Sequence, residues 1–453
     1  MSQRVRYKNP SDETLRHLTM LETSLPQLLI VADSPEALTD LCGISLLERT
    51  RRNVWQLEFC EAVILSNSIK SIEEHVTKQS WHREDVALEF RERKGPQLTI
   101  GDVQDCLSAE RVLVVWAGFY CDGRLLRALA QAEQDSVLID SDVPSITAPL
   151  WKNSGKQSFG RSVCAAVVST EWVSRKNRNA VLRKELESDV MSGRIAAIDA
   201  AKQQAYVPGM RRIVRPVFFS APSPEFRPLA ERLLRDATQS GVLDFPALVH
   251  APIEKWLVSH LCRTTITPNQ ITLGNGVLGL GATVFYAYGY LWAGALLALV
   301  FGVIDGVDGK LARLKVQTTR LGKGEHVLDY CIEMSWWAAL AYYFHSGGQV
   351  PYAYTIWLVF FVADLLERRA KGFVGRKLGR SLDDVSRFDR LVRYVAGRRN
   401  IYTWLFTFSL ALGMPANGFI WLCFWGMASS VIHVFRALQI RSASSPKNAA
   451  AIS

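Results

Sequence analysis

The sequence predicts a soluble α/β domain followed by an all-α domain of six transmembrane helices. Three observations lead to this prediction. The 453-residue chain is 49% hydrophobic and still 21% charged, which suits a chain whose halves lie in different solvents. Residues 264–304 contain no Asp, Glu, Lys, Arg or His, and this stretch is long enough for two spans of ~20 residues each. Upstream, short apolar runs alternate with helical stretches.

The sequence pattern of the first half predicts a cytoplasmic α/β domain over residues 1–245. Its strand-like runs are short and rich in β-branched residues. Helical stretches separate several of them, which favours a mostly parallel sheet covered on both faces. The expected strands are 28–33, 61–66, 86–90, 112–118, 136–142 and 164–170, and the clearest helices are 45–57 and 123–134.

The second half, residues 250–441, predicts the membrane domain. Four apolar runs follow the first two spans, which gives six in all. The turns at 286–292, 346–351 and 413–418 carry no Lys or Arg, whereas the alternate connections carry many. The positive-inside rule then predicts a multi-pass protein of the cell inner membrane with both termini in the cytoplasm. The alternative is a set of buried helices in a soluble protein. The additional runs are 326–345, 352–367, 399–414 and 417–436.

Residues 252–263 predict an amphipathic helix on the membrane surface. Pro252 suits a first helical turn, and apolar residues then share one face. The alternative is a linker helix packed on the soluble domain. At the other end of the chain, the polar segment 442–453 predicts a disordered tail. The residues of the apolar face are Ile253, Trp256, Leu257 and Leu261.

Charge and cysteine usage exclude several classes of protein. The net charge of +10 lies beside apolar spans, so anionic lipid headgroups rather than nucleic acid are the expected partner. The eight cysteines are scattered without a CxxC pair. This argues against structural zinc and a disulfide framework, and it suits a reducing cytoplasm.

Four carboxylates lie at the cytoplasmic ends of the second and third expected spans. Asp305 and Asp308 are three residues apart, and Glu325 and Asp329 are four apart, so each pair shares one helix face. Carboxylates at a membrane edge mark function by default. Convergent oxygen ligands select Mg²⁺, Mn²⁺ or Ca²⁺. The alternative is a solvated patch of charge at the helix ends.

The motif Asp305-x-x-Asp308-Gly309-x-x-Ala312-Arg313, followed by Gly322, resembles the signature of the CDP-alcohol phosphotransferase (phosphatidyltransferase) family. In the strict family spacing, two further carboxylates would fall on His326 and Tyr330. A loop shorter by one residue instead aligns Glu325 and Asp329. The alternative alignment, Asp329 and Glu333, needs three extra residues.

The resemblance implies a magnesium-dependent enzyme with six spans, binding two Mg²⁺ or Mn²⁺ ions. It transfers a phosphoalcohol group from a CDP-linked donor to an acceptor hydroxyl and releases CMP. Either partner is a lipid or an inositol-like polyol, and the enzyme is expected to be a homodimer. Asp329 would act as general base. The implied metal ligands are Asp305, Asp308, Glu325 and Asp329, and the implied CDP-binding residues are Asn269, Thr272, Gly309, Ala312, Arg313 and Gly322.

Two of these assignments have simpler alternatives. Thr267 or Asn269 suits the start of a helix as well as it suits a nucleotide site. Arg398 and Arg399 are expected to bind an acceptor phosphate, but headgroup anchoring explains them equally well.

The first half resembles the nucleotidyltransferase domain that precedes a CDP-alcohol phosphotransferase in archaeal-type inositol phosphate enzymes. Active members need a glycine-rich loop after the first strand, but here no glycine occurs before Gly43. The metal-binding Asp is replaced near Ala117 and Gly118, which leaves the displaced Asp122. We therefore expect an inactive domain. A bifunctional enzyme with an active cytidylyltransferase, and a nucleotide-binding scaffold without turnover, remain the alternatives.

Overall fold

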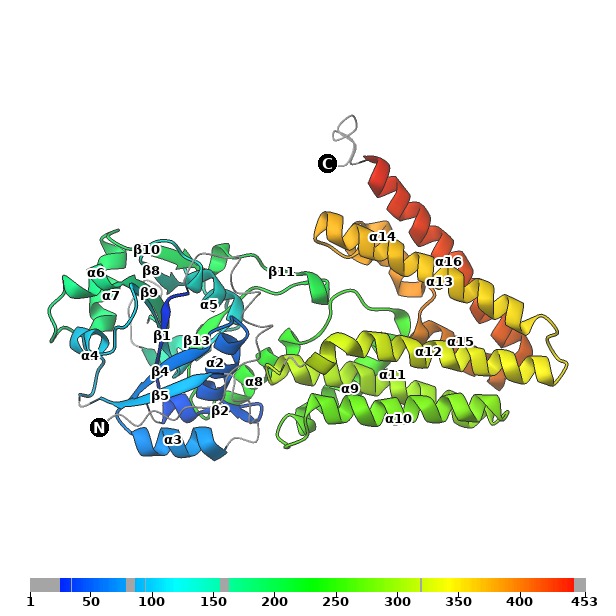
Figure 1. The fold of residues 1–453 in the computed structure, drawn as a ribbon, viewed down its shortest axis with the longest axis horizontal. Helices are drawn as coiled ribbons and strands as arrows, with labels where there is room; N and C mark the ends of the chain where they lie inside the picture. The colour runs from blue at the N-terminus through cyan, green and yellow to red at the C-terminus, as the bar shows by residue number, and fades with distance from the viewer. Residues whose placement is uncertain are drawn as a thin grey trace. The chain divides into compact units, whose positions relative to one another are not determined.

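A computed structural model describes residues 25–33, 35–78, 86–93, 95–154, 163–317 and 320–443; at 152–154, 320–326 and 443 it describes the backbone alone. The chain divides into two compact units, shown in Figure 1. The first contains residues 1–205 and 215–234, and the second contains 206–214 and 235–453. Each unit is described by itself below.

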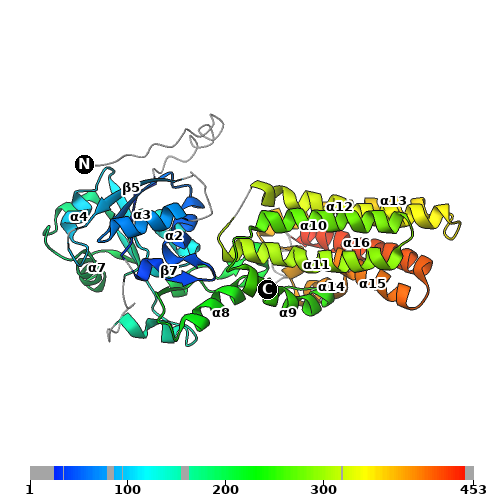
Figure 2. The ribbon, with the colours of Figure 1, turned by 90° about the horizontal axis from the view of Figure 1, so that it is seen from below.

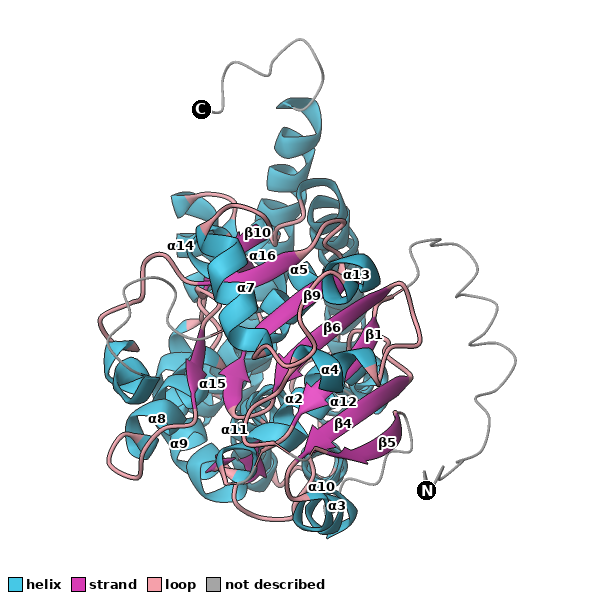
Figure 3. Cartoon of the chain, turned by 90° about the vertical axis from the view of Figure 1, so that its left-hand side faces the viewer, coloured by secondary structure: helices cyan, strands magenta, loops and turns pink. Residues whose placement is uncertain are grey.

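The first unit is built on a seven-stranded sheet, seen in Figure 3. The strand order is β10-β8-β9-β6-β1-β4-β5. Every pairing is parallel except those of β9, which runs antiparallel to β6 and β8. The structure thus confirms the mostly parallel sheet and all six expected strands. The strands are β1 (Gln27–Val31), β4 (Glu61–Ser66), β5 (Ala87–Glu92), β6 (Arg111–Trp116), β8 (Ser136–Ile139), β9 (Ala165–Ser169) and β10 (Ala196–Asp199).

Helices and short hairpins complete this unit. Ser45 caps α2, since its hydroxyl accepts the Glu48 amide at 3.1 Å. The helices are α2 (Leu46–Trp55), α3 (Ile69–Lys78), α4 (Ile100–Gln104), α5 (Gly123–Ala130), α6 (Thr170–Ser174), α7 (Leu182–Met191) and α8 (Arg227–Ala237), whose last turn belongs to the second unit. Short strands are β2 (Asp40–Leu41), β3 (Ile44–Ser45), β7 (Phe119–Cys121) and β13 (Phe218–Ser220), and 3₁₀ turns are η2 (Glu36–Leu38), η3 (Ala148–Ser154) and η4 (Ala200–Lys202).

The second unit is helical, as Figures 1 and 2 show. Six of its helices, α10 to α13, α15 and α16, coincide with the six expected spans. Its helices are α9 (Phe245–Leu261), α10 (Pro268–Ala287), α11 (Leu291–Leu314), α12 (Arg320–Ser346), α13 (Ala353–Leu378), α14 (Arg387–Val395), α15 (Arg399–Ala411) and α16 (Pro415–Ala443). Smaller elements are β11 (Tyr206–Val207), β12 (Arg212–Ile213), η5 (Pro208–Met210) and η6 (Leu382–Asp384).

By length and composition, two helices in the described part of the chain can cross a membrane: α11 and residues 415–442 of α16. The six-span count therefore stays a prediction. Three of the other helices fall short for physical reasons. The 13 residues of α15 reach only ~20 Å at ~1.5 Å per residue, less than the ~30 Å apolar core of a bilayer. Charged residues interrupt α12 and α13.

Aromatic side chains fill the core of the helical unit. Trp336 and Trp337 of α12 are fully buried and meet edge to face. The Trp336 indole donates a hydrogen bond to the Gly279 carbonyl at 2.8 Å. A side chain at Gly279 would lie 2.5 Å from Ile332 and 2.8 Å from Phe301, so the close approach of α10 to α11 and α12 requires glycine there.

The predicted surface helix at 252–263 is longer than expected. α9 begins at Phe245, with Asp244 as its N-cap and Pro246 in the first turn. Pro252 therefore lies inside the helix, and its assignment to the first turn was wrong. Ile253 and Trp256 of the expected apolar face are exposed, and the location of the helix on a membrane surface stays a prediction. At the C-terminus, α16 extends through residue 443, and the rest of the predicted tail lies outside the described residues.

Candidate active site

Asp305 and Asp308 lie near the C-terminal end of α11. Asp308 is only 3% exposed. Its carboxylate accepts a hydrogen bond from the Thr272 hydroxyl of α10 at 3.0 Å. A buried carboxylate needs such partners, because an unsatisfied one would be costly. Thr272, expected at the nucleotide, therefore orients a candidate metal ligand.

The first residue of α15, Arg399, forms an ion pair with Asp305. Its guanidinium also lies over the Phe301 ring, 4.8 Å from the ring centroid. Arg399 interacts electrostatically with Asp329 and Glu333 of α12 as well. Side chains of α11 and of the first half of α12 therefore surround the cation at the start of α15. The sequence predicted a phosphate ligand at this position but gave no sign of the pair with Asp305.

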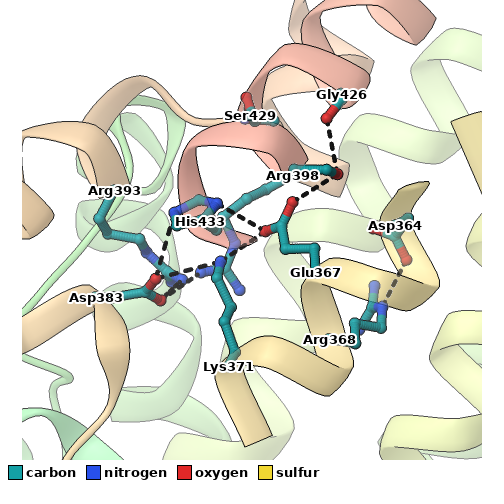
Figure 4. A network of polar contacts seen from close by, with 12 residues as sticks. Asp364, Glu367, Arg368, Lys371, Asp383, Arg393, Arg398, Gly426, Ser429 and His433 are labelled. Carbon is teal, nitrogen blue, oxygen red and sulfur yellow. Dashed lines mark hydrogen bonds and ion pairs between the residues drawn. The ribbon is translucent and has the colours of Figure 1, made fainter. Parts of the chain in front are cut away.

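Arg398 lies just before α15, in the polar network of Figure 4. Its guanidinium is 3.5 Å from Asp383 and 4.0 Å from Asp244. Asp383 also pairs with Arg393 at 2.7 Å and with Lys371 at 3.2 Å. Burial alone would raise the pKa of Asp383, but the neighbouring cations, with Lys371 first, lower it below its ordinary value.

The same network reaches α13 and α16. Glu367 of α13 pairs with Lys371 at 2.7 Å and lies 3.1 Å from His433 of α16. Ser430 donates a hydrogen bond to the same carboxylate at 2.9 Å. Because Asp383 and Glu367 share Lys371, the network ties the connection between α13 and α15 to the bundle. It thereby fixes the segment that carries Arg398 and Arg399.

A buried ion pair joins α9 to α11 beside the two aspartates. Lys310 lies 2.5 Å from Glu254, and both side chains are less than a tenth exposed. Burial raises the pKa of Glu254, and Lys310 opposes that effect. A side chain at Gly306 would come within 2.4 Å of the same carboxyl. The sequence did not predict this pair, because the surface helix expected at 252–263 gives Glu254 no partner on another helix. Lys310 within the aspartate motif was the available signal.

The second half of the carboxylate motif lies on α12. Asp329 is half-buried there. Gly322 and Glu325 belong to the first turn and a half of the helix, but their side chains lie outside the described residues. Among the side chains that are described, no three of the His, Cys, Asp and Glu type come together closely enough to hold a metal ion.

The donor set nevertheless fits a hard cation. Asp305, Asp308 and Asp329 offer carboxylate oxygens, which Mg²⁺ prefers. Asp305 already forms an ion pair with the guanidinium of Arg399, so the negative charge gathered here attracts a cation. The residues present therefore fit a divalent metal.

The remaining predicted nucleotide ligands lie around the same helix ends. Asn269 is half-buried in the first turn of α10, which Thr267 caps with Gln270; the capping alternative is therefore confirmed for Thr267. Ala312 is half-buried on α11. Arg313 donates a hydrogen bond to the Thr238 carbonyl at 3.1 Å, and its guanidinium lies beside the open face of Gly309.

In the first unit, the carboxyl end of β1 has no glycine-rich loop. Asp33 follows β1 and is bound by Arg93 at 2.6 Å, and the 3₁₀ turn η2 follows closely. Asp122 caps α5 and pairs with Arg124 at 2.8 Å. Its role in the structure is therefore that of a helix cap.

Residues 265–367, which contain most of this site, match the family model described as CDP-alcohol phosphatidyltransferase. A Thermococcus kodakarensis protein described as "Bifunctional IPC transferase and DIPP synthase" is 36% identical over 86 residues, 19% of this chain and 20% of that protein. The match thus spans about a fifth of that curated relative.

Two solved structures resemble parts of the fold. The inositol-1-phosphate CTP transferase from T. maritima covers 47% of this chain and 98% of its own, with 12% identity and a TM-score of 0.34. Mycobacterium tuberculosis phosphatidylinositol phosphate synthase with CDP-DAG bound covers 45% and 98%, with 19% identity and a TM-score of 0.32.

The aspartate motif lies within the residues that match the family model. Residues 265–367 match the CDP-alcohol phosphatidyltransferase family model, as the motif predicted. Members of this family are enzymes that transfer substituted phosphate groups.

Proposed function

We propose that this protein transfers a phosphoalcohol group from a CDP-linked donor to an acceptor hydroxyl and releases CMP. One observation supports this more than any other. Asp305 and Asp308, within the family match, lie at converging helix ends, where Thr272 orients one carboxylate and Arg399 contacts the other. The match to the family model supports the reaction class, and these side-chain contacts support its location on the helices.

Each residue has a role in this proposal. Asp329 accepts the proton of the acceptor hydroxyl. The acceptor oxygen then bonds to the β-phosphorus of the donor, and the bond from that phosphorus to the CMP oxygen breaks. Asp305, Asp308, Glu325 and Asp329 would hold two Mg²⁺ or Mn²⁺ ions. Such ions neutralise charge on the phosphate oxygens when bound.

The donor and the acceptor are bound by different groups. The cytidine diphosphate lies against the ends of α10 and α11, where Gly309 leaves room for a phosphate and Arg313 offers a guanidinium. Arg398 and Arg399 face the acceptor, which is an inositol-like polyol phosphate or a lipid. The other proposed CDP contacts are Asn269, Thr272, Ala312 and Gly322.

We further propose that the helical unit lies in the cell inner membrane, with six spans, both termini in the cytoplasm and a homodimeric assembly. α11 and α16 support this proposal by their length and apolar composition. Asp305 lies at the end of α11 that leads to the basic segment 310–323, which the positive-inside rule assigns to the cytoplasm. Residues 1–245 would form an inactive nucleotidyltransferase-like domain that docks or regulates.

CMP release tests the proposal. Purified full-length protein in lipid vesicles is given CDP-diacylglycerol or CDP-inositol together with candidate alcohols and Mg²⁺. We expect CMP release that depends on both partners, stops with EDTA and returns with added Mg²⁺. Absence of metal-dependent CMP release from every donor would overturn the proposal. Pyrophosphate release from CTP, measured in parallel, reports whether the first unit is active, and we expect none.

A nucleotide-binding scaffold is the second candidate, and one observation favours it. Arg399 already contacts Asp305, which a scaffold without turnover would tolerate. Tight binding of CDP together with no CMP release from any pair of substrates would identify the scaffold.

A further inference from the structure

Two charged side chains of the short helix α14 face inward, and three of its apolar side chains face outward. Asp389 and Arg393 are buried; Asp389 pairs with Arg436 of α16 at 2.8 Å, and Arg393 with Asp383 at 2.7 Å. Figure 4 shows Arg393 pointing toward Asp383. The outward side chains are Phe388, Leu391 and Val395, which are 52%, 68% and 46% exposed.

This arrangement is the reverse of a helix on the surface of a water-soluble protein, whose apolar stripe faces the core. The three apolar residues lie at positions i, i+3 and i+7, so they form one stripe. Because ion pairs hold the opposite face of α14 against the bundle, the helix cannot bury this stripe by rotating. The stripe therefore needs an apolar environment outside the described part of the chain.

The C-terminal end of α14 lies beside a tryptophan of a candidate span. The Trp425 indole of α16 donates a hydrogen bond to the Val395 carbonyl at 2.8 Å, and its side chain is 44% exposed. Trp425 lies within the expected span 417–436, whereas Asp389 near the start of α14 pairs with Arg436 at the cytoplasmic end of that span. α14 therefore runs from the level of the interface into the depth of the span.

The apolar stripe of α14 continues onto α9. The Phe245 ring lies edge-on to Tyr394 of α14, with centroids 5.9 Å apart. From Phe245, exposed apolar residues run along one face of α9 through Leu248, Val249, Ile253 and Trp256.

Basic side chains flank this surface. Arg387 and Arg390 of α14 are exposed, as are Arg376 and Lys377 in the last turn of α13. An apolar helix face beside exposed arginines suits an anionic lipid surface. Acyl chains can pack against the apolar residues, and lipid phosphates can bind the guanidinium groups. A protein partner would have to match this whole basic and apolar surface.

We propose that α14 is an interfacial helix that inserts Phe388, Leu391 and Val395 into the cytoplasmic leaflet of an anionic bilayer. Arg387 and Arg390 lie at the level of the lipid phosphates. The Arg393–Asp383–Arg398 contacts then couple this membrane contact to the segment that enters α15. The inference rests on the membrane location in the proposed function and is independent of the transfer reaction.

Spin-label accessibility tests the depth of the stripe. Cysteine is introduced at Leu391, labelled with a nitroxide, and measured in full-length protein in vesicles of phosphatidylcholine and phosphatidylglycerol. Labelled protein without the added cysteine supplies the background from native thiols. K202C, on an exposed side chain of the first unit, is the aqueous control. V431C, exposed on α16, is the control for the bilayer interior.

We expect the L391C label to be several-fold more accessible to oxygen, relative to a water-soluble nickel complex, than the K202C label. F388C should give the same result if L391C does not fold. If the labels at L391C and F388C are accessible as in water while the V431C label is accessible as in lipid, the inference for α14 alone is overturned. An aqueous reading at V431C as well overturns the membrane location. Spin–spin broadening at L391C would show that a second copy covers the stripe, which also overturns the inference.

Discussion

Arg399 of α15 forms an ion pair with Asp305 of α11, although 94 positions separate them in the chain. The pair holds the start of α15 against the aspartate motif. It also gives Arg399 two possible tasks: to balance the carboxylates, and to meet the phosphate of an acceptor.

Replacing Arg399 with alanine is expected to reduce kcat/KM by about 10²-fold or more, because a positioned cation that stabilises developing charge is typically worth that much. R399K keeps the charge but loses the planar fork, so its loss should be smaller. Steady-state CMP release at varied acceptor concentration measures both. Wild-type kinetics in R399A would show that Arg399 does not contribute to the reaction.

Thr272 tests whether the orientation of Asp308 matters. T272V removes the hydroxyl that donates to the buried carboxylate. A hydrogen bond to a charged group contributes ~1.5 kcal/mol or more, so kcat should fall about tenfold. T272S retains the hydroxyl and should stay close to wild type. Equal losses in the two variants would indicate that the methyl group, rather than the hydrogen bond, is important.

The buried pair Glu254–Lys310 predicts a non-additive effect on stability. Either E254L or K310M leaves one charge buried without its partner, which costs about 3–5 kcal/mol of unfolding free energy. The double variant leaves neither charge and should recover most of that loss. Unfolding of the three variants in mixed micelles measures the cycle. Additive losses would show that the two side chains act independently.

Two glycines of α10 provide a matched pair. G279A puts a methyl group within 2.5 Å of Ile332, and overpacking of this kind costs about 1–3 kcal/mol. G274A makes the same change on the same helix, where nothing lies within 4 Å. The unfolding temperature should fall for G279A and stay at the wild-type value for G274A. Similar unfolding temperatures would contradict the tight packing of α10 against α11 and α12.

The sequence predicted the elements better than their contacts. Short runs of β-branched residues marked all six expected strands, but β10 was missed because Ala196–Asp199 is only four residues long and has a single β-branched side chain. The start of α9 was misplaced because Pro252 resembled a first-turn proline. Asp244 followed by Pro246 was the better signal, since an N-cap and an early proline occur together there.

The site was predicted as a set of residues but not as a set of partners. Local spacing places Asp305 and Asp308 on one helix face. No local rule connects Asp305 with Arg399, or Glu254 with Lys310, because tertiary packing of distant helices brings them together. The family resemblance assigned Thr272 to the nucleotide site, and its hydrogen bond to Asp308 was not predicted.

The role of Asp329 as general base is the central claim, and one comparison tests it most directly. CMP release is measured for wild type, D329N and D105N under saturating donor, acceptor and Mg²⁺. D105N makes the same change at a surface ion pair of the first unit and serves as the control. We predict that D105N retains wild-type kcat and that D329N loses about 10²–10⁴-fold, the usual contribution of a positioned base. Full activity in D329N would contradict the proposed mechanism.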